Sequence, residues 1–127
     1  MAKIIIVEDD GILADLYRKK LESGSHTVNI VMDKDAVAQI TKQKPNLVLL
    51  DILMPNVNGL DILRELKASA QTSSIPVLLL TNVAEDSSIA KGLESGAYGY
   101  LLKSETSPDQ VLSRVNMTLE ETAPPTP

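Results

Sequence analysis

The chain has 127 residues, 43% of them hydrophobic, and a formal net charge of −5 at pH 7, which is enough apolar material for one domain with its own core. It contains no cysteine, which excludes disulfides and thiolate chemistry, and its acidic balance argues against a nucleic-acid-binding surface, since such surfaces are normally basic. No apolar run approaches the length of a membrane span and no signal-peptide pattern precedes the first predicted strand, so we expect a cytoplasmic protein that contacts neither membrane nor nucleic acid directly.

The first half of the chain alternates between strand and helix patterns. Residues 4–7 and 47–50 are continuous apolar runs, which is typical of parallel strands covered on both faces. Between these runs, apolar residues at three- and four-residue spacing predict a helix at 12–23 that ends near Gly24, where glycine suits the left-handed position after a helix. A short strand follows at 28–31, and a second helix is centred on 36–40. We therefore predict the order strand, helix, strand, helix, strand.

The second half continues the same alternation. After a loop at 54–59, the pattern predicts helices at 60–66 and 84–94, the second of which is stopped by Gly96. It also predicts strands at 77–80 and 100–102 and a last helix up to Leu119. Ser107 and Pro108 favour the start of that last helix, as its cap and its first turn. Five strand–helix units predict an α/β fold, a doubly wound (βα)5 sandwich of three layers. We expect one domain over residues 1–121 and a flexible, proline-rich tail over 122–127.

Polar groups follow four of the predicted strands directly. Glu8 and Asp9 follow the first strand, Asp51 ends the third, Thr81 follows the fourth and Lys103 follows the fifth. In open parallel α/β sheets the functional crevice lies beyond the carboxyl ends of the strands. Three acids, a hydroxyl and an ammonium group are therefore expected to meet there, which predicts a site for a divalent cation and a phosphoryl group.

These residues belong to longer motifs. They are Val7-Glu8-Asp9-Asp10, Leu50-Asp51-Ile52-Leu53-Met54-Pro55, Asn58-Gly59, Leu80-Thr81, Gly96-Ala97 and Tyr100-Leu101-Leu102-Lys103. Each motif alone is weak, but their order and spacing from residue 3 to about residue 120 resemble the receiver domains of bacterial two-component response regulators. The resemblance implies a fold like that of the chemotaxis regulators, with a parallel sheet in the strand order 2-1-3-4-5.

The resemblance also implies a phosphoacceptor site. Asp51 would accept a phosphoryl group from a sensor histidine kinase or a phosphotransfer protein. Glu8, Asp9, Asp51 and the backbone carbonyl of Leu53 would hold Mg²⁺, for which Mn²⁺ can substitute, and no organic cofactor is implied. Hard oxygen ligands of this kind are those that Mg²⁺ prefers. By this resemblance the chain is a switch that catalyses only its own phosphorylation and dephosphorylation.

Three further residues take their roles from the same resemblance. Lys103 would bind a phosphoryl oxygen, Thr81 would donate a hydrogen bond to another, and Tyr100 would turn inward when Thr81 moves. The surface of the fourth helix, the fifth strand and the fifth helix would then change shape and engage an output domain or protein, and a homodimer is also compatible with this family.

The chain departs from the family pattern at two positions. Ser104 stands where proline with a cis peptide is usual, which predicts a different aim for Lys103. Asn82 stands where alanine or glycine is usual, and its amide is expected to crowd the phosphoryl site. Two other residues have structural interpretations: Asp10 as the cap of the first helix and His26, the only histidine, as a surface residue.

Other functions fit the sequence less well. A phosphatase of the haloacid-dehalogenase type needs a second acid two residues after its nucleophile, where Leu53 stands. A nucleotide- or flavin-binding domain needs a glycine-rich phosphate loop, and the first loop is acidic instead. A receiver-like interaction module that works without phosphorylation remains as the alternative.

Overall fold

The computed structural model describes residues 2–82 and 87–123, with the backbone alone at Asp33. It contains one parallel sheet in the order β2-β1-β3-β4-β5. The strands are β1 (Lys3–Val7), β2 (Thr27–Val31), β3 (Leu47–Asp51), β4 (Val77–Thr81) and β5 (Gly99–Leu102). This confirms the α/β fold and the strand order implied by the sequence.

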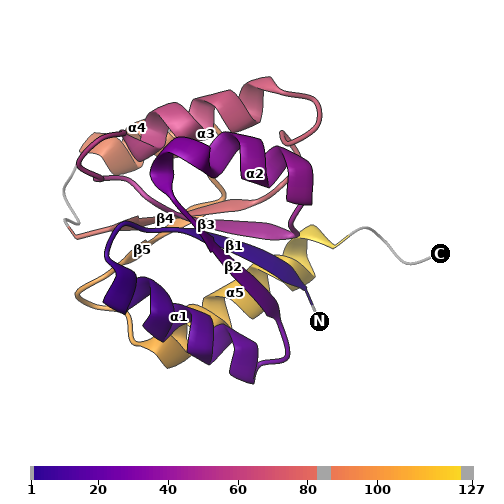
Figure 1. Ribbon diagram of the computed structural model, residues 1–127, viewed down its shortest axis with the longest axis vertical. Helices are drawn as coiled ribbons and strands as arrows, with labels where there is room; N and C mark the ends of the chain where they lie inside the picture. Colours follow the sequence, from indigo (N-terminus) through magenta and orange to yellow (C-terminus); the bar gives the residue numbers. More distant parts are fainter. Residues whose placement is uncertain (1, 83–86, 124–127) are drawn as a thin grey trace.

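Helices cover both faces of the sheet. They are α1 (Gly11–Ser23), α2 (Ala36–Gln43), α3 (Gly59–Ala68), α4 (Ser87–Glu94) and α5 (Pro108–Thr122), with a short 3₁₀ helix at Asp33–Asp35 before α2. Figure 1 shows α1 and α5 on one face and α2, α3 and α4 on the other. None of the helices in the described residues is both long enough and apolar enough to cross a membrane.

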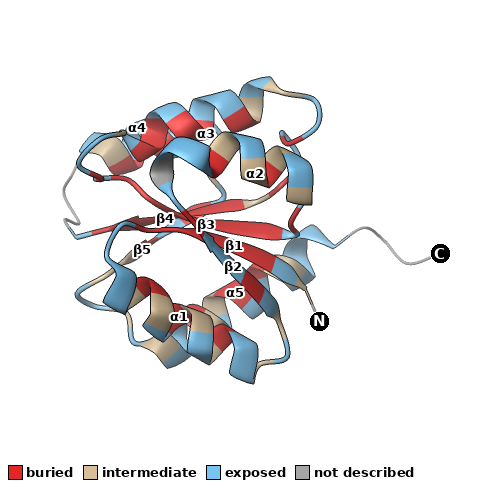
Figure 2. Cartoon of the chain, in the orientation of Figure 1, coloured by how far each residue is buried: buried red, intermediate tan, exposed pale blue. Residues whose placement is uncertain are grey.

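The two faces of the sheet form two separate cores. Alternate residues of β1 point to opposite sides, so Ile4 and Ile6 join α1 and α5 while Ile5 and Val7 join α2 and α3. All five residues of β3 and of β4 are buried, and Figure 2 shows the central strands in red between half-exposed helices. This double burial explains why these strands read as unbroken apolar runs.

Side-chain caps fix where the helices begin. The Asp10 carboxylate accepts hydrogen bonds from the backbone N–H groups of Ile12 and Leu13, as predicted, and Asn58 caps α3 in the same way. Ser107 and Gln110 form a reciprocal capping box at the start of α5. Because α1, α3 and α5 all start at the carboxyl edge of the sheet, these caps also fix the borders of the loops around that edge.

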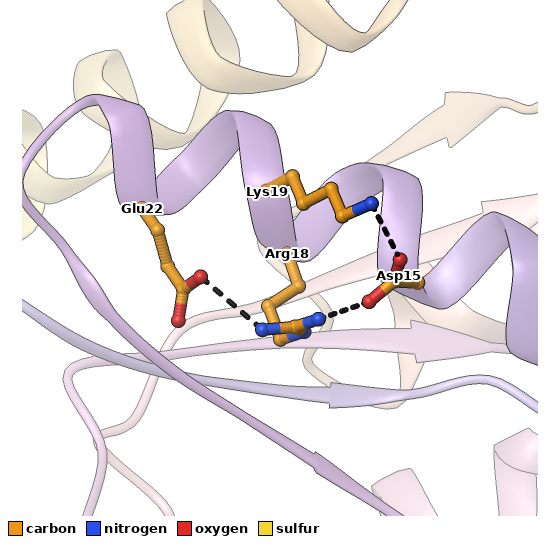
Figure 3. A network of polar contacts seen from close by, with 4 residues as sticks. All are labelled: Asp15, Arg18, Lys19 and Glu22. Carbon is orange, nitrogen blue, oxygen red and sulfur yellow. Dashed lines mark hydrogen bonds and ion pairs between the residues drawn. The ribbon is translucent and has the colours of Figure 1, made fainter.

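The outer side of α1 carries a chain of ion pairs. Arg18 pairs with Asp15 and Glu22, and Lys19 pairs with Asp15, as Figure 3 shows. These side chains are partly exposed, so each pair adds little to stability. Their main effect is to mark the solvent side of α1, opposite the buried stripe of Ala14, Tyr17 and Leu21.

Two local predictions need correction. Gly24 was expected to end α1 in a left-handed conformation, but its φ is −89° and Ser25 takes the positive φ of 71°. A Cβ on Gly24 would lie 2.8 Å from Leu112, so the glycine serves close packing against α5. His26 is half-buried rather than on the surface: its Nδ1 accepts from Ala2 N–H and its Nε2 lies 2.7 Å from Asn116 Oδ1.

Two predicted segments extend beyond the described residues. The helix predicted at 84–94 is seen from Ser87 onward, and residues 84–86 lie outside the described part. At its other end Gly96 has a φ of +106°, which agrees with its predicted role as the stop of this helix. The last helix runs to Thr122, and most of the predicted tail, residues 124–127, also lies outside the described part.

Candidate phosphoacceptor and metal site

Three carboxylates meet at the carboxyl edge of the sheet. Glu8 and Asp9 directly follow β1, and Asp51 is the last residue of β3, the strand beside it. One carboxylate oxygen from each residue lies within 4.8 Å of the other two. Glu8 is 3% exposed and Asp51 is 1% exposed, whereas Asp9 is at the surface. The structure therefore brings together the acids that the sequence placed at neighbouring strand ends.

Lys103 enters this cluster from the end of β5. Its Nζ lies 2.6 Å from Glu8 Oε1 and 3.1 Å from Asp51 Oδ1, and its side chain is only 12% exposed. Its backbone N–H donates to the carbonyl of Thr81 on the adjacent strand, at 2.8 Å. One buried ammonium group thus faces three carboxylates, so the cluster keeps an excess of negative charge.

The turn after Lys103 forms without a cis peptide bond. No cis peptide occurs among the described residues, and the Glu105 N–H donates to the Leu102 carbonyl at 3.1 Å, which closes a turn around Lys103 and Ser104. With serine at position 104, the turn thus keeps a trans peptide, and the ammonium group of Lys103 reaches the acids.

Several carboxylate oxygens in the cluster lack hydrogen bonds. Among the buried side-chain atoms of the described residues, Glu8 Oε2 and both oxygens of Asp51 have no hydrogen-bond partner. Buried carboxylate oxygens without a donor are rare unless an ion satisfies them. Oxygen ligands of a single Mg²⁺ lie at most about 4 Å apart, given Mg–O distances near 2.1 Å, so three oxygens within 4.8 Å need only a small closure. Glu8, Asp9 and Asp51 therefore fit Mg²⁺ by chemistry and by spacing.

The pKa values in the cluster reflect burial and repulsion. Burial, and then the neighbouring carboxylate of Asp51, raise the pKa of Glu8 to about 8, against the opposing effect of Lys103. Partial desolvation, followed by Asp51, also raises the pKa of Asp9. Burial alone would lower the pKa of Lys103, but its hydrogen bond to Glu8 and its ion pair with Asp51 outweigh burial and raise it. The free site thus tends to hold a proton that a cation would displace.

The start of α3 lies directly against the back of Asp51. The Gly59 N–H donates to the Ile52 carbonyl at 2.8 Å. A Cβ on Gly59 would lie 2.1 Å from the Asp51 carbonyl oxygen and 2.9 Å from Ile52 Cα. Only glycine can occupy this position, because the obstructing atoms belong to the backbone.

Comparison with known proteins decides the family. A family model described as "Response regulator receiver domain" matches residues 4–116. The chain is 31% identical over 125 residues to the phosphate regulon transcriptional regulatory protein PhoB of Rhizobium meliloti, covering 98% of this chain and 55% of that protein. It is 32% identical over 118 residues to the DNA-binding response regulator MtrA of Mycobacterium tuberculosis, covering 92% and 50%. The chain belongs to the response regulator receiver domains.

Solved structures agree with this assignment. A putative response regulator from Chloroflexus aurantiacus superposes with a TM-score of 0.86 at 28% identity, covering 94% of this chain and 98% of that one. The signal receiver domain of a histidine kinase from Syntrophus aciditrophicus gives 0.87 at 28% identity, covering 99% and 96%. This chain spans about half the length of the two curated relatives named above.

The remaining predicted residues of the receiver domain lie around the cluster. Thr81 ends β4 and is 1% exposed, Asn82 after it is exposed, and Leu53 lies in the loop after β3, bridged to Asn58, with its side chain 55% exposed. Tyr100 is 41% exposed on β5. The exposed position of Tyr100 differs from the inward one that its predicted switching role requires in the phosphorylated state.

Tyr100 borders a groove of about 400 Å³ next to the acid cluster. The groove is lined by Leu93, Gly99, Tyr100, Leu101, Leu102, Glu105, Thr106 and Arg114. Leu102 and Glu105 are the ends of the turn that carries Lys103 on its other side. The groove and the cluster of acids therefore share one turn.

Sequence reasoning missed two features of this site. It placed Glu8 only in the metal site, and did not anticipate that Lys103 would donate to Glu8 at 2.6 Å. It treated Asn58-Gly59 as turn chemistry, without the contact between Gly59 and Asp51. The opposite charges of Lys103 and Glu8 could have indicated their contact. The contact between Gly59 and Asp51 depends on how closely α3 approaches β3, which the sequence does not indicate.

Proposed function

We propose that this receiver domain accepts a phosphoryl group on Asp51 from a phosphohistidine of a sensor histidine kinase or a phosphotransfer protein. The observation that carries the proposal is the buried Asp51 carboxylate, whose oxygens have no hydrogen-bond partner while Lys103 lies 3.1 Å away. A phosphoacceptor needs an oxygen that is not already held by hydrogen bonds and that lies close to positive charge, because phosphoryl transfer depends on positioning and charge neutralisation.

Transfer of the phosphoryl group from a phosphohistidine to Asp51 forms one bond and breaks another. An Asp51 oxygen attacks phosphorus, the P–N bond to the donor imidazole breaks, and its electron pair returns to the ring nitrogen, which takes up a proton. The product is an acyl phosphate on Asp51. Hydrolysis reverses the modification when water attacks phosphorus, the P–O bond to Asp51 breaks, and inorganic phosphate leaves.

The side chains around Asp51 have separate tasks in this scheme. Glu8, Asp9 and Asp51, with the carbonyl of Leu53, would hold Mg²⁺, which neutralises charge on the transferring oxygens. Lys103 binds a second phosphoryl oxygen through a charge-assisted hydrogen bond. Asn82, exposed beside the site, is expected to hinder access of water and of small donors.

Phosphorylation is proposed to act through Thr81 and Tyr100. A dianionic group on Asp51 draws the Thr81 hydroxyl toward it, and Tyr100 leaves its exposed position for the space behind Thr81. The groove beside Tyr100 then changes shape, and the surface of α4, β5 and α5 binds an output domain or protein, or a second copy of the chain. Phosphate shifts this equilibrium only by its preference for one state.

Two linked experiments test the proposal. Incubation with a small phosphodonor and Mg²⁺ is expected to add one phosphoryl group in intact-mass spectrometry, and Asp51→Asn is expected to abolish the gain. Asp61→Asn, on the exposed first turn of α3, is the matched control and should keep it. Beryllofluoride with Mg²⁺ should shift the NMR signals of Thr81, Tyr100 and α4. Absence of both responses would favour the alternative, an interaction module that works without phosphorylation.

A further inference from the structure

β2 is an edge strand whose sequence does not protect its open side. Among the described residues, no other strand pairs with the outer side of β2. Its five residues, Thr27–Val31, include no charged residue and no proline. Native proteins commonly protect an edge strand with such residues, because its unpaired N–H and C=O groups can pair with another chain. The sequence of β2 therefore leaves this edge available for strand pairing.

The backbone groups that face outward from β2 follow from its pairing with β1. The Thr27 N–H donates to the Ala2 carbonyl, so Thr27 directs its backbone groups toward β1. Successive residues of a strand direct these groups to opposite edges, and Asn29 therefore also faces β1. Val28 and Ile30 direct their N–H and C=O groups away from the sheet. The two outward-facing residues thus flank Asn29 symmetrically.

A groove of about 390 Å³ lies beside this edge, between β2 and α2. Its lining includes Asn29, Ile30, Met32, Gln39 and Gln43. Asn29 donates to Gln43 Oε1 at 2.6 Å, and Gln43 donates to Gln39 Oε1 at 3.0 Å. Ile30 is 36% exposed and Met32, directly after β2, is 58% exposed. The edge therefore offers apolar contacts and side-chain amides in addition to its backbone groups.

A second copy of β2 that runs antiparallel matches the pattern of outward groups. With a two-fold axis at Asn29, Val28 of each copy lies opposite Ile30 of the other. Each such pair exchanges two backbone hydrogen bonds, so the outward groups of both residues are satisfied at once. Val28 belongs to the core that β1 and β2 share with α1 and α5, and Ile30 points to the same face of the strand. The exposed Ile30 side chain thus gains an apolar cross-strand neighbour.

The charges on α2 favour the same orientation. α2 leads from the carboxyl end of β2 to the amino end of β3. It starts after the exposed Asp35, and the exposed Lys42 and Lys44 lie at its end. An antiparallel copy brings the acidic end of one molecule beside the basic end of the other, whereas a parallel copy brings like charges together. Charge complementarity therefore fits a second copy of this chain in antiparallel orientation.

We propose that two copies of this chain pair through their β2 strands, antiparallel about an axis at Asn29, and form one continuous sheet. β2 and β5 are the opposite edges of the sheet, so this pairing leaves the surface of α4, β5 and α5 free and does not require phosphorylation of Asp51. The contact involves one strand and the side of one helix, which is a small interface. We therefore expect a dissociation constant on the order of 10–100 μM.

Sedimentation velocity of the unphosphorylated protein at rising concentration tests the pairing. Ile30→Lys places a charge against the second strand and is expected to weaken the dimer by about tenfold or more. Met117→Lys makes a similar change at a residue of α5 that is 52% exposed, and this matched control should leave the affinity unchanged. Circular dichroism of both variants checks that the fold is kept.

Cross-linking tests the register, and it does not depend on the folding of Ile30→Lys. The chain contains no cysteine, so one introduced thiol reports on one position. Asn29→Cys places two thiols opposite each other at the axis, where the Cα atoms of such a pair are about 4.5 Å apart, within reach of a disulfide. Thr27→Cys, on the same face of the strand, places them more than about 13 Å apart. Under mild oxidation with copper phenanthroline, Asn29→Cys should form linked dimers at least about tenfold faster than Thr27→Cys.

Each outcome decides for or against the pairing of β2 strands. A protein that stays monomeric up to about 1 mM would overturn the proposal and leave an extended segment of another protein as the occupant of this edge. Equal effects of Ile30→Lys and Met117→Lys, or equal cross-linking of the two cysteine variants, would also overturn it, since either result places the contact elsewhere. A dimer that only Ile30→Lys weakens, with cross-linking selective for Asn29→Cys, supports it.

Discussion

Replacing Asp51 by asparagine is expected to change the stability of the metal-free protein in a pH-dependent way. The substitution removes one charge of the cluster and nearly preserves its shape. With an effective dielectric constant of about 20, like charges separated by 4.8 Å, the upper limit of the spacing among the three acids, repel by about 3.5 kcal/mol, and Asp51 attracts Lys103 at 3.1 Å by about 5 kcal/mol. Whether Asp51 stabilises the fold therefore depends on how many of its acidic neighbours are charged.

Whether Asp51→Asn raises or lowers the free energy of unfolding depends on whether Glu8 carries a proton. Glu8 has its pKa raised from 4.5 to about 8 on folding, so the stability that this proton contributes is present below pH 4.5 and is lost as the pH rises through 8. At pH 9 both acidic neighbours of Asp51 are charged, the repulsions exceed the attraction by about 2 kcal/mol, and Asp51→Asn stabilises the fold. At pH 6 Glu8 is protonated, the attraction exceeds the repulsion by a similar amount, and the substitution destabilises it.

The effect of Asp51→Asn on the free energy of unfolding is best compared between the two pH values. The penalty for burying the Asp51 carboxylate is nearly the same at pH 6 and pH 9 and cancels, which leaves a difference of about 3 kcal/mol in the effect of the substitution. Urea unfolding followed by circular dichroism, with a chelator present, measures it at both values. Asp35→Asn, on an exposed carboxylate without a capping hydrogen bond, should change stability by less than about 0.5 kcal/mol at either pH. Equal effects of Asp51→Asn at pH 6 and pH 9 would refute the reasoning.

Three further substitutions or titrations probe the same cluster. The affinity for Mg²⁺ should rise by up to about tenfold per pH unit between pH 6 and 8 and then level off, because the metal displaces the Glu8 proton. Calorimetry in buffers of different ionisation enthalpy would show about one proton released at pH 6. Glu8→Gln should remove the pH dependence of the affinity. Lys103→Met should tighten Mg²⁺ binding several-fold, since the cation no longer competes with an ammonium group, and weaker binding in the same calorimetric titration would contradict the ion pairs described above. Gly59→Ala should lower the free energy of unfolding by about 2–4 kcal/mol and also weaken Mg²⁺ binding, because the added Cβ would clash with the Asp51 carbonyl oxygen and force α3 and the end of β3 apart. An unchanged free energy of unfolding in urea would show that α3 can move freely.

The fold could be predicted from the sequence because burial leaves a clear pattern. β3 and β4 are buried on both faces and therefore read as unbroken apolar runs. The first helix and the last helix are bounded by side chains with capping chemistry, Asp10 and Ser107, so their starts were right. The prediction for Gly24 was wrong because glycine is used both for left-handed backbone and for close packing. The sequence alone does not say which of the two applies at a given position.

The candidate site was predictable in its membership but not in its contacts. Parallel strands align their carboxyl ends, so the approach of Glu8, Asp51 and Lys103 follows from topology alone. Which acid Lys103 selects depends on the turn that follows it and on a balance of distances of a few tenths of an ångström, which no pattern encodes.

The repulsion among the carboxylates of the cluster destabilises the fold, and the same repulsion favours binding of a cation. Three carboxylates with one ammonium group leave Glu8 Oε2 and both oxygens of Asp51 without hydrogen bonds inside the protein. An apolar or fully paired set of side chains at this edge would give a more stable domain. A divalent cation relieves the repulsion at once, so its binding and the stability of the fold are linked. By the same linkage, the phosphoryl group that we propose for Asp51 would bring new negative charge and would need the cation and Lys103 in place. The instability of the free site thus supplies the free energy by which its ligands can change the conformation around it.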